Sequence, residues 1–212
     1  MKLILPLLAA LLCWTTVYSQ DADVISDNQI YSDVLREFIP QVSRGNKYRK
    51  VIYRTKPIKK NIDVKLMEEA IDKKDMSKLA MISTNLITMA NNNIYIDTEL
   101  VNLIRQFEKD TLPDQINYDK IKIPFKTFTF TEAQMQDLFS RGTKEGWNDF
   151  YEEYPRAFGI LEMSGITRSA DGESCMLYVG YQRYGLEGAG YLLWIDMRGE
   201  ISIKGKIKLW ES

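Results

Sequence analysis

The acidic side chains are the first place to look for chemistry in this sequence, because it contains no histidine. Histidine is the commonest general base and the commonest ligand of transition metals. Glu152 and Glu153 are adjacent, so they point in different directions on a helix and do not form a general acid–base pair. Asp171-Gly172-Glu173 places two carboxylates in one turn, and we favour a plain β-turn over a metal loop there. No set of residues indicates a metal ion or a cofactor.

A glycine-rich segment and two serines complete the residues that could carry chemistry. Gly185-x-x-Gly188-x-Gly190 has the look of a phosphate-binding loop, but it lies between two predicted strands and opens no helix. A hairpin connection is therefore the better explanation of this segment. Ser164 and Ser174 have no histidine to activate them as nucleophiles. The sequence leans away from an enzyme, with a carboxylate-based hydrolase of cell-wall or glycan material as the alternative.

An aromatic helix is the first element that must position any site. Trp147, Phe150, Tyr151 and Tyr154 follow the i, i+3, i+4, i+7 spacing of one helical face. Pro155 ends this helix, since proline has no N–H and disfavours the helical conformation of the residue before it. Four aromatic rings on one short helix require a large apolar surface to cover them.

The strands that follow can supply that surface. We place them at 159–168, 175–181, 190–197 and 201–210. The last alternates apolar residues from Ile201 to Leu209 with a face made mostly of lysines, which is typical of an antiparallel strand with one wet side. The expected fold is α+β, with helices packed on a C-terminal antiparallel β-meander. We expect Trp147 and Phe150 to pack on the sheet face that carries Ile203 and Ile207.

The chain before this region is predicted to be mainly helical, over about residues 20–141, and to belong to the same single domain. Helices are indicated by a capping box at Ser26-x-x-Gln29, with Pro40 as the stop, over 63–90, around 98–107, and after a second box at Thr131-x-x-Gln134. Short strands are indicated at 47–55 and 125–130. The stretch Lys47–Lys60 holds seven basic residues and no acidic one. It reads either as an anion-binding patch or, as we favour, as a lysine-protected edge strand with its turn.

The first 19 residues have the pattern of a signal peptide. Lys2 precedes an apolar run from Leu3 to Trp14, which is too short to span a bilayer, and Val17 and Ser19 suit cleavage before Gln20. We therefore expect an exported protein, periplasmic or secreted, that has no membrane span. The formal charge of −1 gives no reason to expect a nucleic-acid partner. After cleavage only Cys175 remains, so no intrachain disulfide is expected; its alternation with Leu177 and Val179 predicts a buried thiol.

The longest connection expected in the meander is Gln182–Ala189. Binding groups gather on loops held by a rigid sheet, and tyrosine and arginine are the side chains most often found at binding hot spots. Arg183, Tyr184 and Glu187 are therefore the candidate binding residues, for a protein partner or a small ligand. A non-enzymatic binding or interaction protein of the bacterial envelope is the function that these features favour.

Several short motifs give the chain a resemblance to a known group. They are Tyr31-Ser32-x-x-Leu35, Trp147-x-x-Phe150-Tyr151-x-x-Tyr154-Pro155, Gly159-Ile160, Leu177-Tyr178-Val179-Gly180, Gly185-Leu186-x-Gly188-x-Gly190-Tyr191-x-Leu193 and Leu209-Trp210. Together they resemble a family of uncharacterised secreted proteins of Bacteroidetes-type bacteria. The resemblance implies export and brings no activity or substrate with it. Members of that family often carry two cysteines four residues apart, where this chain has Arg183 and Glu187. Either these two residues form an ion pair in place of the bridge, or they are unrelated surface residues.

Overall fold

The computed structural model describes residues 25–43, 47–58, 98–111 and 115–212 without Leu186, and a few isolated positions, which are Asp63, Lys65, Glu68, Glu69 and Pro113. The predicted signal peptide, its cleavage before Gln20 and, apart from four of those positions, the helices predicted over 63–90 lie outside the described residues.

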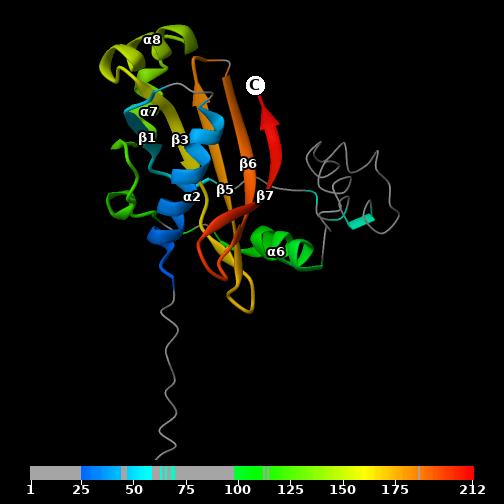
Figure 1. Ribbon diagram of the computed structural model, residues 1–212. Helices are drawn as coiled ribbons and strands as arrows, with labels where there is room; N and C mark the ends of the chain where they lie inside the picture. The colour runs from blue at the N-terminus through cyan, green and yellow to red at the C-terminus, as the bar shows by residue number, and fades with distance from the viewer. Residues whose placement is uncertain are drawn as a thin grey trace, which may run out of the picture.

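A mixed seven-stranded sheet takes strands from both halves of the chain (Figure 1). Its strands are β1 (Lys50–Arg54), β2 (Lys126–Phe130), β3 (Ala157–Met163), β4 (Thr167–Arg168), β5 (Ser174–Arg183), β6 (Glu187–Asp196) and β7 (Ser202–Glu211). Their order is β2-β1-β3-β5-β6-β7, with β4 paired to β5. β1 runs parallel to β2 and β3, whereas the C-terminal strands β5, β6 and β7 are antiparallel neighbours. The predicted α+β fold and its antiparallel C-terminal part are confirmed.

Four α-helices belong to the described residues: α2 (Asp27–Val42), α6 (Thr98–Lys109), α7 (Glu132–Leu138) and α8 (Thr143–Glu153). At Ser26 the structure shows the side-chain half of the predicted capping box, with Ser26 Oγ accepting from the Gln29 N–H at 3.3 Å, whereas Thr131 and Gln134 form the full box. Pro40 does not stop α2 as predicted, because the helix continues to Val42. A proline this close to the C-terminal end interrupts the hydrogen bonding of only one remaining turn.

The helices cover the two faces of the sheet in different ways. α2 lies along one face and buries its apolar side, including Ile30, Leu35 and Phe38, against β1, β3, β5 and β6. We call this the α2 face. On the other face, α6 packs against one end of β5 and β6, whereas α7 and α8 pack against β1 and β3 (Figure 1). We call this the α8 face. On it, α6 lies to one side and α7 with α8 to the other, so that the middle of the sheet lies between these helices.

The strand at 50–54 is not an edge strand, contrary to our prediction. β1 lies between β2 and β3 and is hydrogen-bonded to both. Its three central residues, Val51, Ile52 and Tyr53, are all fully buried, as is typical of a parallel strand that is covered on both faces. The basic residues at and around the strand indicated an edge, but its uninterrupted apolar run is what places it inside the sheet.

The partners of the aromatic helix also differ from the prediction. Trp147 and Phe150 are buried as expected, but they pack with Ile52 and Ile160 of β1 and β3. Ile203 and Ile207 do not even share a face of the sheet.

A bulge in β7 places Ile203 and Ile207 on opposite faces of the sheet. Ile203 pairs with Ile195, and Gly205 pairs with Trp194, so Lys204 is left without a partner in the register. One extra residue turns the following side chains to the opposite face, as far as the second irregularity of this ladder after Lys208. Ile203 therefore packs on the α2 face, whereas Ile207 packs under α6.

Cys175 is buried on the α2 face, together with Leu177 and Val179, as predicted. Its burial raises the pKa of the thiol to about 12, so the reactive thiolate is scarce at neutral pH. We expect less than one-tenth labelling of Cys175 by a maleimide in one hour at pH 7.5 under native conditions, and complete labelling in urea. Fast native labelling would contradict the packing of β5 against α2.

Candidate functional site

The connection between β5 and β6 is a short hairpin turn and not the long loop that we predicted. Arg183 and Glu187 face each other as the last pair of the ladder, so only residues 184–186 join the strands. The glycines at 188 and 190 belong to β6, which removes the phosphate-loop interpretation of this segment. The turn is tight because Tyr184 and Gly185 both have left-handed backbone angles, with φ of 51° and 77°.

Arg183 does not point into solvent, although we predicted it as a surface binding residue. Its side chain is 1% exposed, and its guanidinium lies 5.0 Å from the Tyr181 ring centroid and 5.3 Å from that of Phe158. Nη2 donates to Glu187 Oε1 at 2.7 Å and to the Val42 carbonyl at 3.0 Å. The ion-pair alternative for Arg183 and Glu187 is thus the one that the structure bears out. Arg183 anchors the hairpin to the end of α2 and is not available to a ligand.

Tyr184 is the exposed residue of the predicted set. It is 60% exposed, and it is the one large hydrophobic side chain that is exposed within the described ranges. Its ring stacks on Tyr151 of α8, with centroids 4.3 Å apart and planes inclined by 14°. A non-glycine residue in the left-handed region costs about 1–2 kcal/mol, so the fold spends stability to hold a tyrosine at this place.

A cavity of about 580 Å³ opens beside this stack, and we call it the aromatic pocket. It is lined by Thr143, Lys144, Trp147, Asn148, Tyr151, Tyr184 and Gly185. The three rings follow one another in nearly parallel planes, since Trp147 and Tyr151 are inclined by only 25°. Three polar lining residues of α8, Thr143, Lys144 and Asn148, are exposed, whereas Trp147 is buried. Burial raises the pKa of the Tyr151 hydroxyl, so it stays neutral at physiological pH.

A polar network crosses the α8 face between α6 and α8, and no pattern in the sequence predicted it. Glu162 is 6% exposed and accepts from the Tyr178 hydroxyl at 2.6 Å, while Tyr178 Oη accepts from Trp210 Nε1 at 2.8 Å. Arg54 donates to Glu132 through Nε and Nη2, at 2.5 and 2.6 Å, and lies 3.4 Å from Glu162 through Nη1. These hydrogen bonds to Arg54 lower the pKa of Glu132.

Two glycines make room for this network. Gly180 and Gly190 are paired across β5 and β6, and a Cβ on Gly190 would lie 2.0 Å from Trp210 Nε1. A Cβ on Gly180 would lie 2.4 Å from Tyr178 Oη. The residues Tyr178, Gly180, Gly190 and Trp210 come from three separate motifs of the resemblance described above. Here the four residues act together, because the two glycines leave the space over the sheet that the side chains of Tyr178 and Trp210 occupy.

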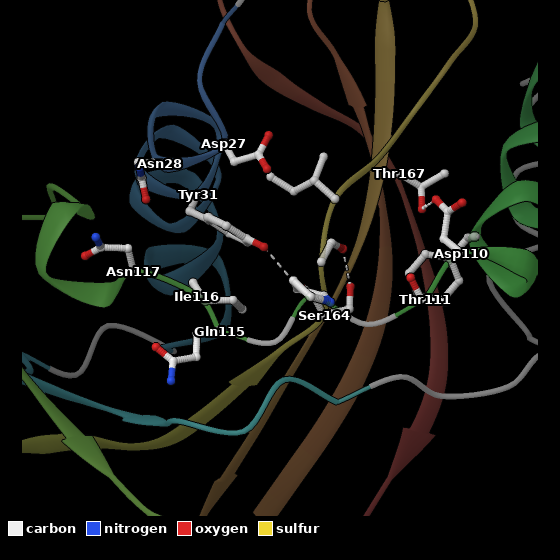
Figure 2. Close-up of a pocket in the computed structure, with 14 residues that line it drawn as sticks. Asp27, Asn28, Tyr31, Asp110, Thr111, Gln115, Ile116, Asn117, Ser164 and Thr167 are labelled. Atoms are coloured by element: carbon white, nitrogen blue, oxygen red, sulfur yellow. Dashed lines mark hydrogen bonds between the residues drawn. The ribbon is translucent and has the colours of Figure 1, made fainter.

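A second cavity, of about 390 Å³, lies between the start of α2, the chain after α6 and the β3–β4 connection (Figure 2). It holds Asp27 and Asp110, the carboxylates that a hydrolase would require. Figure 2 shows them on opposite walls, and each has a partner: Asp27 pairs with Arg168 Nη2 at 2.6 Å, and Asp110 accepts from Thr167 Oγ1 at 2.5 Å.

The hydroxyl groups of this second cavity are also engaged. Tyr31 donates to the Ser164 carbonyl at 2.8 Å, and Ser164 Oγ donates to the Gly165 carbonyl at 2.6 Å (Figure 2). Ser164 Oγ also accepts from the Tyr178 N–H at 2.8 Å. These hydrogen bonds join α2 to the end of β3. Tyr31 and Ser164 therefore have a structural role here, and their contacts do not indicate a nucleophile.

The remaining candidates for chemistry have structural roles. Asp171 accepts from Ser169 Oγ at 2.6 Å and from the Glu173 N–H at 3.0 Å, which makes the segment a β-turn, as we favoured. In the described parts of the chain, no group of three or more cysteine or acidic side chains could hold a metal ion. In the basic stretch Lys47–Lys60, Arg54 forms an ion pair with Glu132. Lys47, Arg49 and Lys56 are exposed.

Comparison of the chain with protein-family models, with curated proteins and with solved structures gave no match. Nor does any helix of the described ranges have the length and apolar character needed to cross a membrane.

Proposed function

We propose that this chain is an exported, non-enzymatic binding protein of the bacterial envelope and that the aromatic pocket is its recognition site. The observation that carries the proposal is Tyr184, which is exposed, stacked on Tyr151 and held in a left-handed backbone conformation. Backbone strain at an exposed aromatic residue beside a pocket is typical of functional sites. Export rests on the signal-peptide pattern of residues 1–19.

Contacts on both faces of the sheet hold the hairpin that carries the Tyr184 ring in place. On the α2 face, Arg183 is locked among aromatic rings and bound to the end of α2. On the α8 face, Tyr184 rests on Tyr151, which in turn packs edge-on against the fully buried Phe150 at 4.9 Å. A preorganised aromatic surface loses little entropy when a ligand binds, which is an advantage for affinity.

The test compares wild type with Tyr184→Asn. Asparagine tolerates the left-handed conformation, so relief of strain offsets the lost ring stacking and the free energy of unfolding should change by less than about 1 kcal/mol. Both proteins are immobilised, extracts of the native bacterial envelope are passed over them, and the retained molecules are identified by mass spectrometry.

We expect the wild type to retain at least one ligand about tenfold more strongly than Tyr184→Asn. Glu152→Ala, an exposed change elsewhere on α8, is the control and should behave as wild type. Equal retention by wild type and Tyr184→Asn of everything that binds would show that the aromatic pocket is not the recognition site.

A further inference from the structure

We infer that the ligand of the aromatic pocket is a glycan and that Tyr184 stacks on the face of one of its pyranose rings. This inference rests on the proposed function and adds the ligand class. It follows from the shape of the aromatic surface, the polar groups around it, its charge, and the neighbouring strands.

The aromatic surface offers one open ring face. Trp147 is 6% exposed and Tyr151 is covered by Tyr184, so Tyr184 alone presents a free face to solvent. The face of an aromatic ring is electrostatically negative and its edge is positive. The face of a pyranose is a flat array of C–H groups with weak positive charge, and it matches one such ring in size and polarity.

The lining of the pocket also contains polar groups of the kinds that hydrogen-bond to sugar hydroxyls. Lys144, Asn148 and Thr143 are exposed on α8 and offer an ammonium, an amide and a hydroxyl group. The ring hydroxyls of a pyranose point outward from its edge, where groups of these kinds can bind them. The cavity volume of about 580 Å³ is within the range of small-ligand sites, roughly 300–1,000 Å³.

The charge of the pocket excludes the other ligand that aromatic faces attract. Ammonium ligands bind in cages of aromatic rings, most strongly where the cation is shielded from water. A nearby carboxylate would favour such a cation further. Lys144 is the sole charged residue among the described residues that line this pocket, and none of them is acidic. A cationic ligand would be repelled, whereas a neutral or acidic sugar would not.

The surrounding strands argue against a peptide. Peptides that bind by strand addition need a free sheet edge, but β5 lies between β3 and β6, and β6 lies between β5 and β7. Proline-rich peptides dock into grooves between several exposed aromatic side chains. This surface has one exposed ring, so it suits a ligand that uses a single flat face.

The experiment applies fluorescently labelled mature protein to a printed array of bacterial and plant glycans and to an array of proline-rich peptides. Wild type, Tyr184→Asn and Tyr184→Phe are compared, and the hits are repeated by calorimetry with the free oligosaccharide. We expect glycan binding by wild type, retention within about threefold by Tyr184→Phe, and a loss of about tenfold or more in Tyr184→Asn. Phenylalanine keeps the ring face and loses only the hydroxyl, so this pattern is specific for stacking.

Two further variants complete the test. Lys144→Gln should weaken binding of sugars that carry a carboxylate more than binding of neutral sugars, and Glu152→Ala should change neither. Glycan binding that Tyr184→Asn leaves unchanged, binding of proline-rich peptides alone, or no bound glycan on the array would each overturn the glycan assignment. The envelope extract separates these cases from failure of the proposed function, because a non-glycan ligand lost in Tyr184→Asn would preserve the aromatic pocket as the recognition site.

Discussion

Raising the pH to about 11 is expected to unfold this protein cooperatively. Four buried tyrosines, which are Tyr31, Tyr53, Tyr118 and Tyr178, have pKa values raised well above the ordinary value, chiefly by burial. Burial also raises the pKa of Cys175 to about 12. In the unfolded chain these groups ionise at their ordinary pKa values of about 10 and 8.5. The folded state therefore holds protons that the unfolded state has already released.

The sign of the effect follows from that difference. Because the unfolded state binds fewer protons at alkaline pH, the free energy of unfolding falls as the pH rises. The stability is fully present below about pH 8 and decreases above the unfolded pKa values. At pH 11 each of the four buried tyrosines costs between about 1 and 2 kcal/mol and the thiol a little over 3 kcal/mol, so their combined loss is about 9 kcal/mol. Total stabilities are about 5–15 kcal/mol, which places the midpoint near pH 11.

The measurement is a pH titration followed by far-UV circular dichroism and by tyrosinate absorbance. Both signals should change together in one cooperative step. Tyr53→Phe is the matched variant, because the fully buried Tyr53 hydroxyl has no hydrogen-bond partner among the described residues. Removing it should raise stability by about 1 kcal/mol at pH 7 and shift the midpoint upward. Tyrosinate absorbance that rises gradually through pH 11.5 with the circular dichroism unchanged would contradict the burial of these residues.

Phe150→Ala is expected to destabilise the protein by about 3–5 kcal/mol. Phe150 is fully buried, and its ring lies edge-on to Trp147 at 5.2 Å and to Phe130 at 6.1 Å. It thus joins α8 to β2 and supports the ring of Tyr151. Its loss removes apolar contacts and leaves a cavity that the surrounding rings cannot fill.

Urea unfolding measures this change, with Glu152→Ala as the control that should stay within about 0.5 kcal/mol. Phe150→Leu, which retains most of the volume, should lie between wild type and Phe150→Ala. Ligand binding should weaken in Phe150→Ala even at low temperature, where the chain is folded, because Tyr151 and Tyr184 lose their support. A midpoint shift as small as that of the control would show that α8 does not pack on β1 and β3.

The antiparallel strands of the C-terminal half could be predicted because the information is local. Their residues alternate or run apolar over eight to ten positions and are separated by turn residues. The burial of Trp147 and Phe150 was equally accessible from helical spacing. Their partners were not, because Ile52 lies far away in the sequence and no local pattern specifies which strand a helix covers. The bulge at Lys204 was also invisible, since Ile203 and Ile207 keep perfect alternation in the sequence.

The candidate site was predicted in part for a similar reason. Tyr184 stood out because it lies in a glycine-rich turn, and it is exposed as expected. Arg183 was expected beside it, but Arg183 is the last residue of β5 and turns to the α2 face, where its guanidinium donates to Glu187, Val42 and Tyr48. Trp147 and Tyr151 complete the pocket from a helix more than thirty residues earlier in the chain. Only the folded arrangement brings them together.

The central position of β1 also has a consequence for the order of events in folding. β1 is made early, yet Lys50 pairs with Lys126 on one side and Ala157 on the other. Its two ladders cannot both form until the chain has been synthesised beyond β3, and contacts so distant in sequence form slowly. Folding should therefore begin in the β5–β6–β7 meander, whose neighbours are adjacent in sequence, and β1 should be captured last. A chain that is slow to fold in this way remains extended for longer, which would suit the export that we propose.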